Sequence, residues 1–207
     1  MNARGESALL QPPFSPATPY RVLFVCTGNI SRSAYAEAAA RARTPASLAF
    51  SSAGTHALVG HPIDPAMVNF TPDPKMATRH RARQLSRGIL VNSDLVLAME
   101  REHRRYLLDE WPDQSRKVFV LGHAARELAC LPDEVTLGGL VEYLWRNRTS
   151  VPGDAVSDPY GRGDEAARAA ARAIGGHLDS ILPCLERLAG EYAARPADGS
   201  PPCTNLP

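Results

Sequence analysis

The stretch RVLFVCTGNISRSAYAEAAARAR, from Arg21 to Arg43, decides the fold. After Arg21, four apolar residues lead to Cys26; a short loop containing Gly28 and Asn29 follows, and the stretch ends in an alanine-rich run. An apolar run without polar alternation is typical of a strand buried on both faces. Alanine strongly favours a helix. The stretch therefore predicts a strand, a tight loop and a helix, in that order.

Three further apolar runs have the composition of strands. They are LAFSSA from Leu48, DLVLAM from Asp94 and KVFVL from Lys117, and segments with helical spacing separate them. This alternation predicts βαβ units and thus an α/β fold, with helices on both faces of a parallel sheet. The apolar face over 174–188 predicts a long last helix, in which Pro183 would cause a kink.

The length and composition suit one domain. Of the 207 residues, 44% are hydrophobic, which is enough for a full core. We expect the folded domain to span residues 20–193. Proline-rich, polar ends favour disordered tails at 1–19 and 194–207. Apolar residues between about 130 and 154 predict an added helix before a Pro-Gly loop.

Charge and cysteine usage exclude several classes of protein. A net charge of +1 gives no general attraction to nucleic acid or to an anionic membrane. No apolar run is long enough to span a membrane, and the N-terminal segment lacks the apolar stretch of a secretory signal, so we expect a cytoplasmic protein. The cysteines are scattered, which indicates free thiols rather than disulfides or a zinc site: Cys26, Cys130, Cys184 and Cys203.

The loop after the first strand has the features of an anion site built around a nucleophile. The strand ends at the sheet edge where ligands of α/β folds bind, so the sulfur of Cys26 is expected there. Backbone N–H groups of the loop and the helix N-terminus favour a phosphate and a thiolate. The planar guanidinium of Arg32 would hold two phosphate oxygens. Gly28 permits a tight turn, Asn29 tolerates a left-handed conformation, and Ser33 is placed to donate its hydroxyl to the sulfur.

The Cys-x5-Arg spacing is weak evidence by itself. Because arginine is frequent in this chain, such a pair arises often by chance. The alternative is a buried cysteine that ends a strand beside a surface arginine. The position between a strand and a helix, with Gly, Asn and Ser inside the loop, favours the anion site.

The sequence VLFVCTGNISRSAYAE resembles the phosphate-binding loop of the low-molecular-weight protein tyrosine phosphatases. The resemblance continues through SSAGT, HRARQL, DLVLAMEREHR and DPYG, over about residues 21–189. It implies a three-layer fold of the phosphotyrosine phosphatase I type with a four-stranded parallel sheet, and no metal or other cofactor. In that family the loop cysteine attacks phosphorus, the arginine holds the equatorial oxygens, and an aspartate in an Asp-Pro pair is the general acid. These roles would fall to Cys26, Arg32 and Asp158.

The resemblance also implies partners and supporting residues. The substrate would be a phosphotyrosine-containing protein, and inorganic phosphate or other oxyanions would inhibit. Ser52 and His80 match residues that hydrogen-bond the loop asparagine and hold its strained backbone, although His80 alone would equally suit an ordinary surface histidine. We expect the nearby Arg79, Arg81 and Arg83 to lie on a solvated helix face. The residues expected to line the phosphate and substrate site are Thr27, Gly28, Asn29, Ile30, Ser31, Ser33 and Tyr160.

The residues alone leave the general acid open. Asp-Pro occurs at Asp64, Asp73 and Asp158. An acid near the leaving oxygen protonates it, and its carboxylate then activates water. The first two pairs lie in a proline-rich connection and most simply begin a turn or a helix. Asp158 precedes Tyr160 and Gly161, which favours a mobile loop over a cleft, with an ordinary turn as the alternative.

The chain departs from the family pattern at three places. Ser31 stands where many members have a second cysteine, so an oxidised Cys26 would lack a neighbouring thiol to trap it. Ala34 replaces the usual proline after the loop serine. The sequence HAL from His56 stands where an aromatic residue often forms one wall of the phosphotyrosine slot, so this wall is expected to be thin.

These observations favour a cysteine-dependent phosphatase that hydrolyses phosphotyrosine through a phosphocysteine intermediate. One alternative on the same fold is a protein arginine phosphatase, a branch that tends to carry Thr where Ile30 stands; another is a phosphatase of small phosphomonoesters. Arsenate reduction would need a further closely spaced cysteine pair. A phosphate-binding module without catalysis is the alternative from another class.

Overall fold

The computed structural model describes residues 18–44, 46–72, 74–149 and 151–194. The tails expected at 1–19 and 194–207 lie almost entirely outside the described residues, so the boundaries of the domain stay a prediction. Within the described part, no helix combines the length and the apolar character needed to cross a membrane.

The core of the molecule is a four-stranded parallel sheet with strand order β2-β1-β3-β4. Each predicted apolar run forms one strand, which confirms the expected α/β fold. In the register of the sheet, Cys26 is paired with Gly54, so the central strand β1 and the edge strand β2 end side by side at the carboxyl edge of the sheet. The strands are β1 (Tyr20–Cys26), β2 (Leu48–Gly54), β3 (Leu95–Ala98) and β4 (Val118–Val120).

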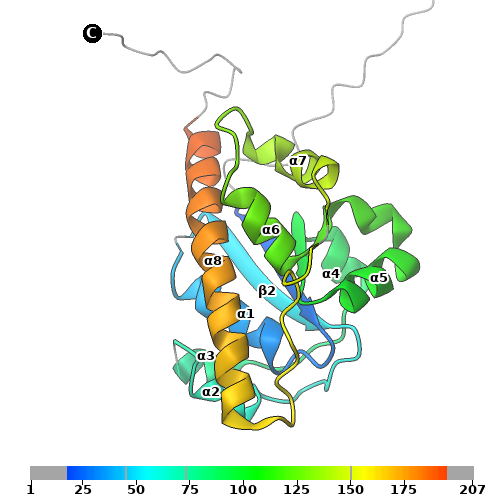
Figure 1. Ribbon diagram of the computed structural model, residues 1–207, viewed down its shortest axis with the longest axis vertical. Coiled ribbons are helices and arrows are strands. Elements are labelled where there is room, and N and C mark those ends of the chain that lie inside the picture. Colours follow the sequence, from blue (N-terminus) through cyan, green and yellow to red (C-terminus); the bar gives the residue numbers. More distant parts are fainter. Residues whose placement is uncertain (1–17, 45, 73, 150, 195–207) are drawn as a thin grey trace, which may run out of the picture.

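Helices cover both faces of the sheet, giving three layers. Side chains of β1 alternate between two cores: Val22 and Phe24 pack with α1, α6 and α8, whereas Leu23 and Val25 pack with α4 and α5. In Figure 1, α1 and α8 lie in front of β2. The helices are α1 (Arg32–Arg41), α2 (Pro65–Val68), α3 (Pro74–Arg79), α4 (Arg87–Val91), α5 (Arg101–Glu110), α6 (Leu121–Leu128), α7 (Leu140–Arg146) and α8 (Gly163–Ala193), with 3-10 turns η1 (Pro112–Lys117) and η2 (Leu137–Gly139).

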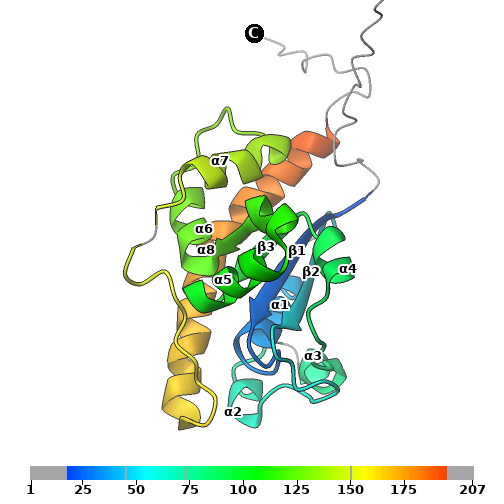
Figure 2. The ribbon, with the colours of Figure 1, turned by 90° about the vertical axis from the view of Figure 1, so that its right-hand side faces the viewer.

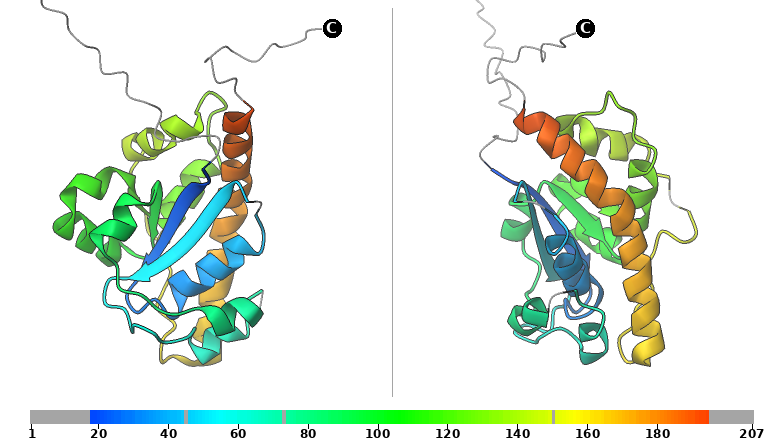
Figure 3. Two further views of the ribbon diagram at one scale, coloured as in Figure 1. Left: turned by 180° about the vertical axis from the view of Figure 1, so that it is seen from behind. Right: turned by 90° about the vertical axis from the view of Figure 1, so that its left-hand side faces the viewer.

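The last helix, α8, has 31 residues and continues through Pro183. It runs along the length of the sheet (Figure 3), and its axis is bent (Figure 2). Proline removes one backbone N–H from a helix and clashes with the preceding turn, which is the physical reason for the kink expected at Pro183. Between residues 130 and 154 the chain forms η2 and α7.

One expectation about local structure is wrong. Arg81 and Arg83 do not lie on a helix face, because α3 ends at Arg79 and the chain then runs to the edge of β2. There the backbone N–H of Gly54 donates to the carbonyl of Arg83 (3.0 Å). The guanidinium of Arg83 also donates to the carbonyl of Ser52 (2.7 Å). The arginine-rich segment therefore extends the sheet edge instead of covering a helix.

Candidate active site

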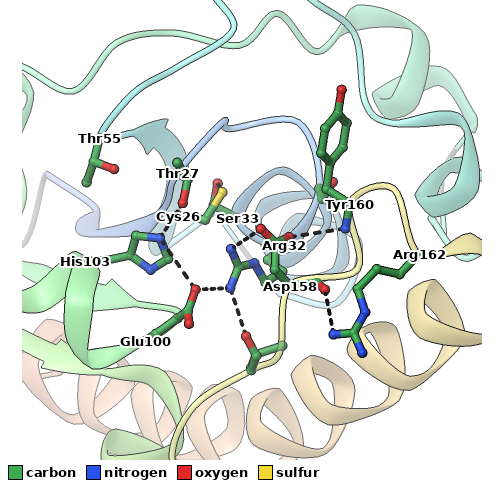
Figure 4. Close-up of polar contacts among 12 residues, drawn as sticks. Cys26, Thr27, Arg32, Ser33, Thr55, Glu100, His103, Asp158, Tyr160 and Arg162 are labelled. Atoms are coloured by element: carbon green, nitrogen blue, oxygen red, sulfur yellow. Dashed lines mark hydrogen bonds and ion pairs between the residues drawn. The ribbon is translucent and has the colours of Figure 1, made fainter.

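The residues from Cys26 to Arg32 form a loop between the end of β1 and the start of α1, around a small pocket of about 190 Å³. The predicted loop residues and the Asp-Pro segment meet there (Figure 4), although 132 positions separate Cys26 from Asp158 in the sequence. The expected residues that line the pocket are Cys26, Thr27, Gly28, Ile30, Ser31, Arg32, Asp158 and Tyr160, joined by His56 and Leu58.

The sulfur of Cys26 is buried and hydrogen-bonded. Ser33 Oγ lies 2.9 Å from Cys26 Sγ. The same hydroxyl oxygen accepts from the side-chain amide of Asn29 (3.0 Å), which leaves its hydrogen free to point at the sulfur. Such a donor stabilises a thiolate, the nucleophilic form of cysteine.

Arg32 is almost completely buried, with 1% of its surface exposed. Its Nη1 donates to the carbonyl of Val156 (2.9 Å) and to the carboxylate of Glu100, while Nη2 lies 3.0 Å from Asp158 Oδ2. Its Nε is buried and has no hydrogen-bond partner among the residues that the structure describes. A buried N–H of this kind is normally satisfied, and a phosphate oxygen in the pocket would satisfy it.

Asn29 holds the loop in its curled shape. It has a φ of 55°, in the left-handed region that few residues other than glycine adopt. Its side-chain amide donates to Ser52 Oγ (2.8 Å), its side-chain oxygen accepts from the N–H of Arg83 (2.9 Å), and its carbonyl is bonded to His80 Nε2 (2.7 Å). Ser52 and His80 thus make the contacts expected of them, and these bonds offset the backbone strain.

Three residues of the site were missed by sequence reasoning. Glu37 accepts from the hydroxyl of Ser52 (2.7 Å) and so directs the lone pair of that oxygen toward Asn29. Glu100 is the N-cap residue of α5 and His103 lies in the first turn of that helix, which follows β3 closely. The signal for the last two was present, because the carboxyl end of a parallel strand lies at the same edge as Cys26. Glu37 lies one helical turn after Ser33, on the same side of α1.

His103 of α5 is hydrogen-bonded to the loop. Its Nε2 is 2.8 Å from Thr27 Oγ1 and 3.8 Å from the carboxylate of Glu100. Burial, and to a smaller extent the charge of Arg32, lower the pKa of His103 from 6.5 to about 4. The imidazole is therefore neutral near pH 7, and its interaction with Thr27 is a hydrogen bond between neutral groups.

The three Asp-Pro pairs have different surroundings. Asp158 faces the pocket, with 48% of its side chain exposed, and accepts from the N–H of Tyr160 (3.3 Å). Asp64 caps the N-terminus of α2 by accepting from the N–H of Ala66 (2.9 Å), as the sequence suggested for a helix start. Asp73 lies outside the described residues. Of the two described pairs, Asp158 has the geometry suited to an acid acting in this pocket.

The pocket entrance is partly open. Leu58 and Tyr160 both line the pocket and have 39% and 59% of their surfaces exposed. In Figure 4 the ring of Tyr160 points away from Cys26. Within the described part of the chain, no three His, Cys, Asp or Glu side chains are grouped so as to hold a metal ion.

A family model described as Low molecular weight phosphotyrosine protein phosphatase matches residues 21–133. The chain belongs to this family. Among curated relatives, the protein-tyrosine-phosphatase Wzb of Escherichia coli K12 is 38% identical over 113 residues, which cover 54% of this chain and 76% of Wzb. Etp of the same strain is 28% identical over 175 residues, covering 84% of this chain and 93% of Etp.

Solved structures of the same fold extend the match beyond residue 133. The YwlE arginine phosphatase from Geobacillus stearothermophilus superposes with a TM-score of 0.66 at 25% identity, over 84% of this chain and 97% of YwlE. The low molecular weight protein tyrosine phosphatase from T. tengcongensis gives a TM-score of 0.61 at 30% identity, over 79% and 98%. The four-stranded parallel fold of the family is therefore confirmed for this chain.

Proposed function

We propose that this protein hydrolyses phosphotyrosine in proteins through a phosphocysteine intermediate, with Cys26 as nucleophile, Arg32 as phosphate-binding residue and Asp158 as general acid. The observation that carries the proposal is the meeting of a hydrogen-bonded Cys26 sulfur, a pinned Arg32 with an unpartnered Nε, and the Asp158 carboxylate in one pocket. Membership of the phosphatase family supports it.

In the first step, the thiolate of Cys26 attacks phosphorus and the bond to the phenolic oxygen breaks. Protonated Asp158 gives its proton to that oxygen, so that a neutral phenol leaves. The N–H groups of the loop and Arg32 stabilise the charge on the three equatorial oxygens. In the second step, water attacks phosphorus, the S–P bond breaks, and Asp158 takes a proton from the water. The products are inorganic phosphate and the regenerated thiolate.

The supporting residues keep this arrangement rigid. Glu100 and the carbonyl of Val156 fix the guanidinium of Arg32, so little reorganisation is needed when phosphate binds. Asn29 holds the loop curled with help from Ser52 and His80, and Thr27 is tied to His103. Each of these roles is a positioning role, because the residue acts through Cys26, Arg32 or the loop.

The pocket favours an aryl ester as substrate. Ile30, with 7% of its surface exposed, Leu58 and Tyr160 give the pocket apolar walls suited to a phenyl ring. The likeness to the YwlE arginine phosphatase supports a second candidate, hydrolysis of phosphoarginine. That branch tends to carry Thr at the position of Ile30, and the branched apolar side chain here favours tyrosine.

The test is the initial rate of hydrolysis of para-nitrophenyl phosphate, a phosphotyrosine peptide and a phosphoarginine peptide, without added metal. We expect turnover to favour phosphotyrosine and Cys26→Ser to abolish it. Cys184→Ser is the matched control, because this half-buried thiol lies on α8 away from the pocket and its loss should leave the rate unchanged. Full activity of the Cys26 variant would sink the proposed mechanism.

Two results would redirect the proposal. A preference for phosphoarginine would overturn the argument from Ile30, and phosphopeptide binding without any turnover would favour a binding module. Inorganic phosphate or vanadate should inhibit competitively, because each would bind in the loop where the phosphate group of the substrate binds. A cytoplasmic location belongs to the same proposal, since Cys26 must stay reduced to act; cell fractionation would test it.

A further inference from the structure

A second cavity, of about 860 Å³, shares no lining residue with the Cys26 pocket, although the ring of its Tyr106 contacts the ring of His56 in that pocket at 5.3 Å. It is formed by α5, the end of β4, α6 and the residues that follow α7; α5 and α6 are seen at the right and centre of Figure 1. This volume falls within the range of small-molecule sites, roughly 300–1,000 Å³. We call it the basic cavity because four arginines line it: Arg101, Arg104, Arg105 and Arg148.

Among the residues that the structure describes, three of these arginines lack an acidic partner. Arg105 is paired with Asp109 at 3.7 Å. Within the described ranges, Arg101, Arg104 and Arg148 have no carboxylate within 4 Å. Glu102 also lines the cavity and forms no ion pair with any described residue. The cavity therefore holds an excess of positive charge.

Backbone carbonyls hold the three guanidinium groups in place. Arg104 Nε donates to the carbonyl of Val118 (2.9 Å), and Arg101 Nη2 reaches that of Val151 (3.5 Å). Arg148 donates to the carbonyl of Trp145 and stacks on its ring, 4.3 Å from the centroid. Each group keeps further N–H donors for a ligand, and the pinned side chains lose less entropy on binding.

Arg104 and Arg148 lie close enough for their charges to interact. Burial, and then the charge of Arg148, lower the pKa of Arg104 from its ordinary value. Two like charges in a partly buried site repel each other, and an anion bound between them relieves that repulsion. Arginine pairs with phosphate through two parallel hydrogen bonds, so two neighbouring arginines suit a group with several anionic oxygens.

The rest of the lining is suited to a ring. Leu108 and the ring of Tyr106, both half-buried, contribute apolar surface, and the nearly buried Phe119, Val120 and His123 lie beneath them at the bottom of the cavity. An extended acidic peptide would need an unbroken row of cations, whereas Glu102 and Asp109 interrupt this one. A compact molecule with a ring at one end and clustered charge at the other fits both parts of the cavity.

We propose that the basic cavity binds a phosphorylated small molecule of the nucleoside diphosphate class, with its phosphates between Arg104 and Arg148 and its ring on the apolar lining. The site is independent of phosphoryl transfer at Cys26. The Cys26→Ser variant therefore retains it, and the failure of this proposal would be distinct from the failure of the proposed function.

The probe is ADP, titrated calorimetrically into the full chain. We expect the double variant Arg104→Gln/Arg148→Gln to bind ADP at least about tenfold more weakly, because charge-assisted hydrogen bonds are lost. The double variant Arg87→Gln/Arg172→Gln is the control: it removes the same charge from exposed positions elsewhere and should bind ADP like the wild type. Should Arg104→Gln impair folding, the exposed Arg148→Glu alone must still weaken ADP binding by a similar factor.

Comparison ligands identify the class of molecule. Adenosine and inorganic phosphate should each bind much more weakly than ADP, since each offers only half of the contacts. The proposal would be overturned if ADP did not bind. It would also be overturned if all variants bound ADP equally, because that result is expected of a ligand in the Cys26 pocket. Phosphate binding as tight as that of ADP, or tighter binding of a glutamate hexapeptide, would overturn the nucleotide class.

Discussion

At the residue scale, an ion pair joins Arg32 to the proposed acid, Asp158. Asp158 Oδ2 lies 3.0 Å from Arg32 Nη2, and the carboxylate is half-exposed while the guanidinium is buried. A substrate phosphate would compete for the same guanidinium N–H group, because a dianion pairs more strongly with arginine than one carboxylate does. The carboxylate would then be released toward the leaving oxygen. The contact thus keeps the proposed acid close to the reaction.

The Asp158→Asn variant should test whether Asp158 protonates the leaving oxygen in the first step. We expect hydrolysis of phosphotyrosine to slow by about 10²-fold or more, because the phenolate would leave without a proton. The loss should be smaller with para-nitrophenyl phosphate, whose leaving group needs protonation less. The measurement is kcat/KM for both esters, which reports the first step alone, because the second step is the same for every substrate. Asp179→Asn is the control: this carboxylate of α8 is exposed, pairs with Arg43 and does not line the pocket, so its loss should leave both values unchanged. Equal losses for both esters would contradict the assignment of Asp158.

The first turn of α5 is the element that connects the sheet to the site. The helix begins three residues after β3; its N-cap residue Glu100 contacts Arg32, and His103 in its first turn contacts Thr27. The same turn presents Arg101 and Arg104 to the basic cavity. Residues three apart in a helix share a face, so Glu100 and His103 point to the pocket together while their neighbours point elsewhere. One helix end thereby serves two sites.

His103 should make folding stability depend on pH. Its pKa is about 4 in the folded chain and 6.5 in an unfolded one. Between these values the unfolded chain binds more protons, so stability contributed by the neutral imidazole is present above about pH 6.5 and is lost as pH falls toward 4. His103→Gln should flatten this part of the profile of Tm against pH, measured by calorimetry from pH 4.5 to 7. The exposed His61→Gln is the control and should keep the wild-type slope. An unchanged slope in His103→Gln would refute the argument.

At the scale of the whole molecule, local patterns predicted the layers but not the contacts between them. The strands followed from apolar runs such as that of β1, and the loop from Gly28 and Asn29 beside Cys26, because these signals are local in sequence. Glu100 could not be chosen over other acidic residues, since its role depends on how β1 and β3 pair. Arg83 was misplaced because arginine favours helices, whereas its segment is held by bonds to Gly54 and Asn29.

The segment with η2 and α7 contributes to the main core at the end of the sheet opposite Cys26. Its residues Leu137, Leu140 and Leu144 are buried in the same cluster as residues of α8. Arg116 pairs with Glu142 across to this segment at 2.6 Å. The segment is therefore an integral part of the domain, and its apolar contacts should matter for stability more than for catalysis.

Leu144→Ala tests this division between stability and catalysis. Leu144 is completely buried, so the change removes apolar contacts and leaves a cavity at a cost of about 2–5 kcal/mol. The free energy of unfolding in urea should fall by that amount, while kcat and KM of the remaining folded enzyme stay close to the wild-type values, because Leu144 contributes nothing to the Cys26 pocket. Val91→Ala, at a half-exposed position of α4, should change the free energy of unfolding by less than about 0.5 kcal/mol. If the Leu144 variant were as stable as the Val91 variant, the packing of α7 would contribute little to the free energy of unfolding, and the argument would be wrong.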